Sequence, residues 1–479
     1  MEKKPLLING EWVETSHAIS NINPSDTSDV IAEYFQAGRA EMQSAIEAGK
    51  TAFETWSHST PQQRHDVLKK AGDEIMQRSA EIGELLSREE GKTLAEGKGE
   101  TIRAAQIFDF FAGEALRLTG DIVPSVRPNL TAEISREPLG VVGVITPWNF
   151  PIAIPAWKIA PAICYGNTVV LKPAELVPGC SWVLADILHR AGLPAGVLNL
   201  VTGPGSVVGN EMVENPEVAA ITFTGSQATG AAIAQKCVSR FCKFQLEMGG
   251  KNPMVVLDDA DLDNAVECAV NGAFFSTGQR CTASSRLIVT EGIYSQFIGA
   301  TIERLRSLKI DNALKPDTDI GPVVDQTQLD QDVEYIEIAR KDGASIRFGG
   351  ELLRRDTEGF YLSPALITET SNDMRINREE VFGPVASVIR VKDYEEALAV
   401  ANDTEFGLSA GICTGSLKHA THFKRNSQAG MVMVNVPTAG VDYHVPFGGT
   451  KGSSYGAREQ GSYAKEFYTT VKTAYTAAV

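Results

Sequence analysis

Several features that would assign this chain of 479 residues to a special class of protein are missing. No apolar run reaches the length of a transmembrane helix, and the N-terminus shows no signal peptide. The seven cysteines are scattered, their number is odd, and none shows zinc-ligand spacing. Internal repeats and low-complexity segments are also missing. We therefore expect a cytoplasmic protein with free thiols and no metal site.

An excess of positive charge is missing as well. The formal net charge of −16 argues against nucleic acid or an anionic membrane as the main partner. With 43% hydrophobic and 22% charged residues, the composition is that of an ordinary globular protein. Because the chain is too long for one hydrophobic core, we expect two or three domains.

Apolar strands alternating with helices predict an α/β fold. Continuously apolar strands are typical of parallel sheets that are buried on both faces. Strand and helix alternate in two successive series, which favours two doubly wound domains with ligands at the carboxyl ends of their strands. The predicted strands are 140–146, 169–171, 197–201 and 220–223 in the first series and 253–257 and 286–290 in the second. The main predicted helices are 41–56, 102–118, 181–191, 262–275 and 294–308.

Two segments fall outside this alternation. Residues 121–137 contain two prolines and alternating side chains, which predicts an exposed hairpin or arm. Residues 467–475 alternate Tyr, Val and Ala with Thr and Lys, which predicts a strand that pairs with this arm or with another subunit.

A Gly-x-Gly-x-x-Gly dinucleotide fingerprint is also missing. The turn at Gly225 and Ser226 follows a strand and opens a helix, so it could bind a phosphate, although a plain strand–helix turn is the simpler interpretation. Lys172 and Glu175 leave another strand end together and could bind a ribose, or could form only a surface ion pair. A carboxylate there would repel a 2′-phosphate.

The sequence does contain a candidate nucleophile, Cys281, on a predicted turn after an apolar helix. Gly278 supplies backbone freedom and Arg280 a nearby positive charge that could lower the thiol pKa. Asn149, bracketed by prolines, could donate to an oxyanion, and Glu247, among apolar residues, could act as a general base. Taken singly, each also has a plain structural interpretation: an inert buried cysteine, a turn asparagine and a solvated glutamate.

Two later loops complete the set of candidates. Glu380 and Phe382 precede a Gly-Pro turn, where a carboxylate could hold a ribose while a ring packs on a flat cofactor. The glycine-dense segment 445–456 could line the mouth of a pocket, or could simply be flexible.

Together these segments resemble the aldehyde dehydrogenase superfamily over essentially the whole chain. The similarity lies in the joint order and spacing of seven motifs. They are Pro-Trp-Asn-Phe-Pro (147–151), Leu-Lys-Pro-Ala-Glu (171–175), Phe-Thr-Gly-Ser (223–226), Leu-Glu-Met-Gly-Gly-Lys-Asn-Pro (246–253), Gly-Gln-Arg-Cys (278–281), Glu-Val-Phe-Gly-Pro (380–384) and Pro-Phe-Gly-Gly (446–449).

The resemblance implies oxidation of an aldehyde to an acid, with NAD or NADP as cofactor. Cys281 would attack the aldehyde, Asn149 would hold the oxyanion, Glu247 would activate water, and Lys158 with Glu459 would relay protons. The cofactor residues that the resemblance implies are Thr146, Pro147, Trp148, Lys172, Glu175, Gly205, Gly225, Ser226, Glu380 and Phe382. Glu175 favours NAD over NADP.

The resemblance also implies a domain organisation and an assembly. An NAD(P)-binding domain would comprise residues 1–120 and 138–247, and a catalytic domain residues 248–440. The oligomerisation arm and tail would comprise residues 121–137 and 463–479, giving a homodimer or a homotetramer.

Within the superfamily, segments 438–449 and 451–456 resemble bacterial enzymes that oxidise α-ketoglutaric semialdehyde (2,5-dioxopentanoate). Some semialdehyde enzymes carry an arginine that grips the substrate carboxylate where this chain has Trp157. Arg280 or a residue near Tyr443-His444 would have to replace it, and the candidate substrate residues are Arg280, Trp157 and Phe447. The alternatives are a structural Arg280 with uncharged aldehydes as substrates, succinate semialdehyde, a non-catalytic member of the fold, or a thiol-dependent acyl transferase or hydrolase.

Overall fold

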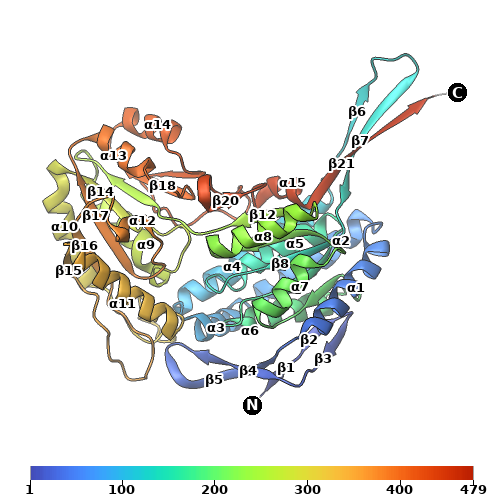
Figure 1. The fold of residues 1–479 in the computed structure, drawn as a ribbon, viewed down its shortest axis with the longest axis horizontal. Coiled ribbons are helices and arrows are strands. Elements are labelled where there is room, and N and C mark those ends of the chain that lie inside the picture. Colours follow the sequence, from blue (N-terminus) through green and yellow to red (C-terminus); the bar gives the residue numbers. More distant parts are fainter. Residues whose placement is uncertain (1, 478–479) are drawn as a thin grey trace.

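A computed structural model describes residues 2–477 and contains two large mixed sheets, two small sheets and the helices around them (Figure 1). The α/β class predicted from the strand–helix alternation is confirmed. None of the helices in the described residues is both long and apolar enough to cross a membrane.

The first large sheet has eight strands in the order β20-β12-β11-β8-β9-β10-β2-β3. Its five central strands are parallel, and the strands at both edges are antiparallel. The central strands are almost wholly buried, as expected for a sheet covered on both faces. The strands are β2 (Leu6–Ile8), β3 (Glu11–Val13), β8 (Val141–Ile145), β9 (Thr168–Lys172), β10 (Leu198–Leu200), β11 (Val218–Thr224), β12 (Lys243–Glu247) and β20 (Ser454–Tyr455).

Helices cover both faces of this sheet. One face packs on α2 (Pro61–Gln77), α3 (Ser79–Glu90), α4 (Leu94–Ala115), α5 (Ala153–Cys164) and α6 (Pro178–Arg190). The other face packs on α1 (Arg39–Trp56), α7 (Asn210–Glu214) and α8 (Gln227–Ser239). Helix α4 begins eight residues before the predicted 102, because Thr93 and Glu96 form a capping box there.

The second large sheet has seven strands in the order β15-β16-β17-β14-β13-β18-β19, all parallel except β15. The strands are β13 (Pro253–Val256), β14 (Arg286–Thr290), β15 (Ser345–Phe348), β16 (Ala365–Thr370), β17 (Val385–Val391), β18 (Ser409–Cys413) and β19 (Met431–Val434). Around it lie α9 (Leu262–Phe274), α10 (Glu291–Arg306), α11 (Gln326–Lys341), α12 (Arg375–Arg378), α13 (Tyr394–Asn402) and α14 (Leu417–Asn426).

A three-stranded arm projects from the body of the molecule (Figure 1). Strands β6 (Asp121–Pro124) and β7 (Leu130–Pro138) form the predicted hairpin, and β21 (Thr469–Ala477) pairs antiparallel with β7 along its whole length. The predicted pairing of the tail with the arm is therefore confirmed within one chain. A last small sheet joins β1 (Lys3–Lys4), β5 (Asp26–Phe35) and β4 (Ala18–Asn23), and α15 (Lys465–Tyr468) precedes β21.

The two large sheets meet through a short connection. Strand β12 of the first sheet ends at Glu247, and β13 of the second begins at Pro253. The predicted boundary between the NAD(P)-binding and catalytic domains, after residue 247, falls at the start of this connection. The division into domains itself stays a prediction.

Candidate active site

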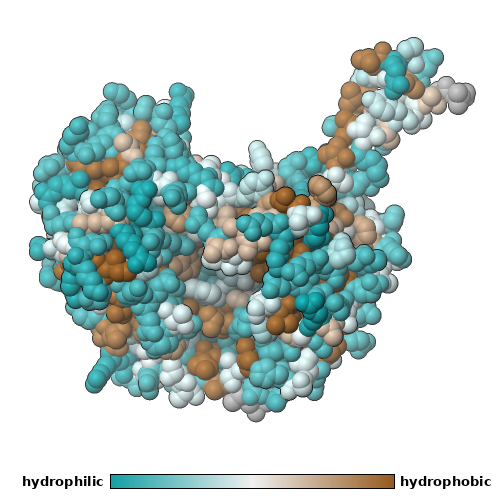
Figure 2. Space-filling model, in the orientation of Figure 1, coloured by the Kyte–Doolittle hydropathy of each residue, from teal (hydrophilic) through white to brown (hydrophobic). Residues whose placement is uncertain are grey.

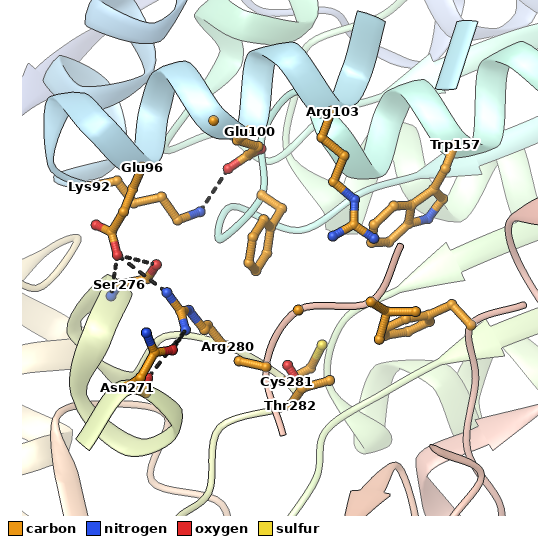
Figure 3. Close-up of a pocket in the computed structure, with 16 residues that line it drawn as sticks. Lys92, Glu96, Glu100, Arg103, Trp157, Asn271, Ser276, Arg280, Cys281 and Thr282 are labelled. Atoms are coloured by element: carbon orange, nitrogen blue, oxygen red, sulfur yellow. Dashed lines mark hydrogen bonds and ion pairs between the residues drawn. The ribbon is translucent and has the colours of Figure 1, made fainter. Parts of the chain in front are cut away.

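A cavity of about 330 Å³ lies where the two halves of the molecule face each other (Figure 3). From the first half it is lined by residues of α4 and α5 and of the segments before them, and from the second half by the end of α9 and the turn that holds Cys281. Four predicted site residues line it: Cys281, Arg280, Trp157 and Phe447. The Trp157 and Phe447 rings stack with their centroids 5.5 Å apart, giving the cavity one aromatic wall.

The turn before Cys281 has an unusual backbone. Ser276, Thr277 and Gly278 have φ angles of 50°, 56° and 66°, a left-handed conformation that only glycine adopts readily. Glu96 of helix α4 holds this turn: its Oε1 accepts from Ser276 N at 2.8 Å and from Ser276 Oγ at 2.9 Å. The strained turn is therefore fixed from the opposite half of the molecule.

The Cys281 thiol is partly exposed to the cavity and is protonated at rest. Burial, followed by the negative charges of Glu380 and Glu247, raises its pKa to about 12. The backbone N–H groups of Cys281 and Thr282 act in the opposite direction and favour the thiolate. A nucleophile in this environment needs a base to take its proton, or an event that lowers its pKa.

The lowering of the thiol pKa by Arg280 stays a prediction, and the structure gives the Arg280 guanidinium other partners. Its guanidinium turns away to Glu96, at 3.3 Å, and to the carbonyl of Asn271, also at 3.3 Å. No contribution of Arg280 figures among the causes of the Cys281 shift. Arg280, which precedes Cys281 in the sequence, is thus bound to the carboxylate of Glu96 on α4. The order of residues alone could not predict this contact.

Asn149 lies just after β8 and is buried. Its Nδ2 donates to the carbonyl of Gln279 at 2.9 Å, two residues before Cys281. Its own carbonyl accepts from Nζ of Lys92. The side chain therefore faces the segment that carries the nucleophile, although in this structure its amide is bound to the backbone.

Glu247 is the last residue of β12 and is buried. Its Oε2 accepts from the Ser454 hydroxyl at 2.5 Å, and its Oε1 has no hydrogen-bond partner among the described residues. Burial first, and then the charge of Glu459, raise its pKa well above the usual value for a glutamate. A carboxyl group with one free oxygen and a raised pKa has the properties of a general base.

Lys158 and Glu459 form a buried ion pair, as the predicted relay requires. Nζ of Lys158 also donates to the Thr222 hydroxyl at 2.8 Å. Because Glu459 contributes to the pKa shift of Glu247, the pair and the candidate base belong to one electrostatic cluster. These side chains come from α5, β11, β12 and a loop near the C-terminus.

A second cavity, of about 600 Å³, lies at the ends of the strands of the first sheet, between α8 and the segment 205–213. Lys172 and Gly205 line it. The Lys172 ammonium lies 3.7 Å from a carboxylate oxygen of Glu175, and the N–H of Gly205 donates to that same oxygen at 3.2 Å. A Cβ on Gly205 would approach nothing but the Lys172 side chain, at 4.0 Å, so the backbone here is open to a ligand.

The remaining predicted cofactor residues are not among the residues that line these two cavities. Ser226 caps α8, and the N–H of Gly225 donates to the carbonyl of Glu247 at 3.0 Å. Thr146, Pro147 and Trp148 form the bend after β8, and the Trp148 ring meets the Phe382 ring edge-on at 5.3 Å. Glu380 accepts from the N–H of Gly250 at 2.7 Å, and burial raises its pKa to about 7.

Some residues of the site had no signal in the sequence. Glu96, which holds the strained turn, and Arg103, which lines the first cavity, lie on a charged helix whose polar residues resemble an ordinary solvated face. Ser454, the partner of Glu247, lies in the glycine-dense loop after Phe447. Only the packing of α4 and of this loop against the nucleophile segment identifies them.

The comparisons define the class of protein. Residues 12–474 match the model described as "Aldehyde dehydrogenase family". The chain therefore belongs to the aldehyde dehydrogenase family, and it is an enzyme of that family.

Individual relatives place it more narrowly. The chain is 47% identical to alpha-ketoglutaric semialdehyde dehydrogenase of Bacillus subtilis (strain 168), over 98% of this chain and 97% of that protein. Its structure matches betaine aldehyde dehydrogenase from Staphylococcus aureus, crystallised with NAD+, with a TM-score of 0.96, 34% identity and coverage of 99% and 95%. It also matches an "E. coli NADP dependent enzyme" with a TM-score of 0.96, 35% identity and coverage of 100% and 98%.

Proposed function

We propose that this enzyme oxidises α-ketoglutaric semialdehyde to 2-oxoglutarate with NAD(P)+, and that Cys281 is its nucleophile. The observation that carries the proposal is the cavity that ends at Cys281 and combines an aromatic wall with cationic side chains. Such a cavity suits a short chain with a reactive carbonyl at one end and a carboxylate at the other. The Bacillus subtilis relative, whose name states this substrate, supports the same assignment.

The residues around the second cavity fit a dinucleotide. Lys172 and Glu175 offer a donor and an acceptor to ribose hydroxyls, and Ser226 lies at the N-terminus of α8, where phosphate is favoured. Glu380 and Phe382 would hold the nicotinamide end beside Trp148. When bound, NAD(P)+ supplies an acceptor for the hydride that the aldehyde gives up. The Glu175 carboxylate would repel a 2′-phosphate, which favours NAD.

In the first step, the Cys281 thiol, which is partly exposed to the cavity, gives its proton to water, and Sγ forms a bond to the aldehyde carbon. The carbonyl oxygen becomes an oxyanion, for which the N–H of Cys281 and the Asn149 amide are the donors at hand. To do so, Nδ2 of Asn149 breaks its hydrogen bond to the carbonyl of Gln279 and donates to the substrate oxygen instead. Loss of a hydride then leaves an acyl group joined to Sγ.

In the second step, Glu247 takes a proton from water, and the hydroxide attacks the acyl carbon and breaks the C–S bond. The free Oε1 is available for that proton, while Ser454 holds Oε2. Lys158 and Glu459 would carry the proton onward to solvent. Overall, an aldehyde, NAD(P)+ and water give a carboxylate, NAD(P)H and two protons.

For the assembly and location we propose a homodimer or homotetramer in the cytoplasm. The arm exposes apolar side chains far from the body of the molecule, where a second subunit would cover them (Figure 2). All seven cysteines are free, as expected in a reducing compartment.

The test is a panel of aldehydes with and without a remote carboxylate, each assayed with NAD+ and with NADP+. We expect α-ketoglutaric semialdehyde to give the highest kcat/KM, and NAD+ to be preferred. If it is oxidised no faster than hexanal, the substrate assignment is wrong, and the broad-specificity alternative takes its place. If succinate semialdehyde is the better substrate, a shorter acid is the natural one.

A further inference from the structure

Three cationic side chains line the first cavity, and they differ in how their charge is balanced. Lys92 lies 2.9 Å from a carboxylate oxygen of Glu100. Arg280 pairs with Glu96 at 3.3 Å. Arg103 forms no ion pair within residues 2–477, although it lines the same cavity. Of the three positive charges, that of Arg103 is the one left without a carboxylate.

The hydrogen bonds of Arg103 are incomplete as well. Its Nη2 donates to Oε1 of Gln460 at 3.1 Å. Its Nε is buried and has no hydrogen-bond partner among the described residues. A guanidinium carries five N–H donors in a rigid fork, and buried donors without an acceptor are rare in folded proteins. The missing acceptor is therefore expected to come from a ligand.

The position of Arg103 fits such a ligand. In Figure 3 it descends from α4 into the cavity, beside Trp157, while Cys281 lies on the opposite side. Its guanidinium carbon lies 5.7 Å from the centre of the Trp157 ring. The indole limits the movement of the guanidinium and excludes water from one side of it, which strengthens any ion pair formed there.

We propose that Arg103 binds the carboxylate of the substrate and selects aldehydes that carry a carboxylate several carbons from the carbonyl. This inference rests on the proposed function and names the residue that recognises the acid end of the substrate. A carboxylate can accept two parallel hydrogen bonds from a guanidinium, which fixes its orientation as well as its place. Arg103 is then a specificity residue that reaches the site from the other half of the molecule.

Arg280 is the competing candidate, since it also lines the cavity. Its Nη2 and Nη1 are occupied by Glu96 and Asn271, so a substrate carboxylate would have to displace them or share their charge. It would also be repelled by the Glu96 carboxylate. Arg103 feels the charges of Glu100 and Asp442, but neither carboxylate forms an ion pair with it, so in the described part of the chain its guanidinium has no bound partner to displace except the amide of Gln460.

The experiment compares Arg103→Gln and Arg103→Lys with the wild-type enzyme. The substrates are an ω-oxo acid of five carbons and pentanal, which has the same length but no charge. We expect Arg103→Gln to lower kcat/KM for the ω-oxo acid roughly 10- to 100-fold, mainly through KM, because a hydrogen-bonded ion pair is lost. For pentanal we expect a change of less than about threefold. Arg103→Lys should recover part of the loss.

Arg117→Gln is the matched control, because Arg117 follows the same helix, is largely exposed, and pairs with Glu114 outside the cavity. It changes the net charge equally and should leave both substrates unaffected. An equal loss for pentanal and for the ω-oxo acid would show that Arg103 is structural. Unchanged kinetics for both would show that the carboxylate binds elsewhere. Either result overturns the inference.

A second readout does not depend on turnover. Alkylation of Cys281 by iodoacetamide is followed by mass spectrometry with and without 2-oxoglutarate. The dicarboxylate should slow alkylation in the wild-type enzyme and in Arg117→Gln, but not in Arg103→Gln. If the wild-type enzyme oxidises no ω-oxo acid, the proposed function fails. Loss of protection in Arg103→Gln would still support the carboxylate site, whereas equal protection would refute it.

Discussion

The two groups proposed to carry the chemistry, Cys281 and Glu247, both lie in surroundings that disfavour their charged forms. Burial raises the pKa of the thiol to about 12 and that of the carboxyl group well above its usual value. The negative charge of Glu247 also raises the pKa of the Cys281 thiol, so deprotonation of Glu247 opposes that of Cys281. Activity should therefore rise with pH above the usual titration range of a glutamate, as Glu247 loses its proton.

The raised pKa of Glu247 predicts how the substitution Glu247→Gln changes the stability of the folded protein with pH. A carboxyl group whose pKa is raised on folding stabilises the folded state below its unfolded pKa, and this contribution is lost as pH rises through the folded value. The glutamine variant has no such loss. We expect its Tm to exceed that of the wild type by roughly 2–4 °C at pH 8 and by much less at pH 4.5.

Differential scanning calorimetry across this pH range measures the effect. Glu214→Gln is a suitable control, because Glu214 is exposed and its hydrogen bond with Lys236 lowers its pKa, which is the opposite direction to the shift of Glu247. A Tm difference for Glu247→Gln that is the same at all pH values would contradict the raised pKa.

Residue types and order were enough to predict Cys281, Glu247 and Asn149 as candidates, because each stands at a strand end or a turn in a recognisable motif. Their roles stay predictions. The interpretation of Arg280 as the activator of the thiol also stays a prediction, and Glu96 from a distant helix binds its guanidinium. Arg103 was not predicted at all, because it follows Glu96 and Glu100 at helical spacing on a charged helix, and such a pattern is also that of an ordinary solvated face.

At the scale of elements, the turn Phe275–Gly278, which precedes Cys281, fixes the position of the thiol. Its left-handed residues would be unfavourable alone, costing of order 1–3 kcal/mol for each non-glycine residue. Glu96 offsets this by bonding Ser276 twice while its other oxygen accepts from Thr93 N at 3.1 Å. One carboxylate thus starts helix α4 and fixes the nucleophile turn.

Gly278→Ala tests this turn. A methyl group at this position would have to tolerate a φ of +66° and would lie 2.1 Å from the carbonyl oxygen of Gly383. The turn must therefore move, and we expect kcat to fall at least about tenfold, with slower alkylation of Cys281.

The control is Gly192→Ala, where φ is +96° but nothing lies within 4 Å of the added methyl group. It carries the same kind of backbone cost without a collision and should retain wild-type kcat. Full activity in Gly278→Ala would show that the precise turn geometry does not position the thiol.

At the scale of the whole molecule, the apolar strand pattern was sufficient to predict the two sheets, because fully buried parallel strands need continuous apolar residues. Strand order and the antiparallel edges were not predictable, since β2 and β20 join a sheet whose other strands are far away in the sequence. The way in which the two halves face each other, on which the cavity at Cys281 depends, has no local signal in the sequence either.

The arm gives the prediction that belongs to this scale. Ile122 is 77% exposed on β6, and Val471 and Tyr475 are also exposed on the arm. If these side chains lie in a subunit interface, Ile122→Glu buries a charge and should shift the protein toward smaller species in sedimentation velocity. Leu352→Glu, at a site 62% exposed on the body, is the control. An unchanged sedimentation profile for Ile122→Glu would argue against assembly through this face.

The measurement that tests the central proposal most directly is rapid-quench mass spectrometry of Glu247→Gln mixed with NAD+ and α-ketoglutaric semialdehyde. Because this variant keeps the thiol but lacks the base, we predict a burst of about one NADH per active site and an acyl adduct on the peptide that contains Cys281. Cys281→Ala should show neither. Production of NADH by Cys281→Ala at the wild-type rate, or a burst without any adduct on Cys281, would contradict the covalent mechanism.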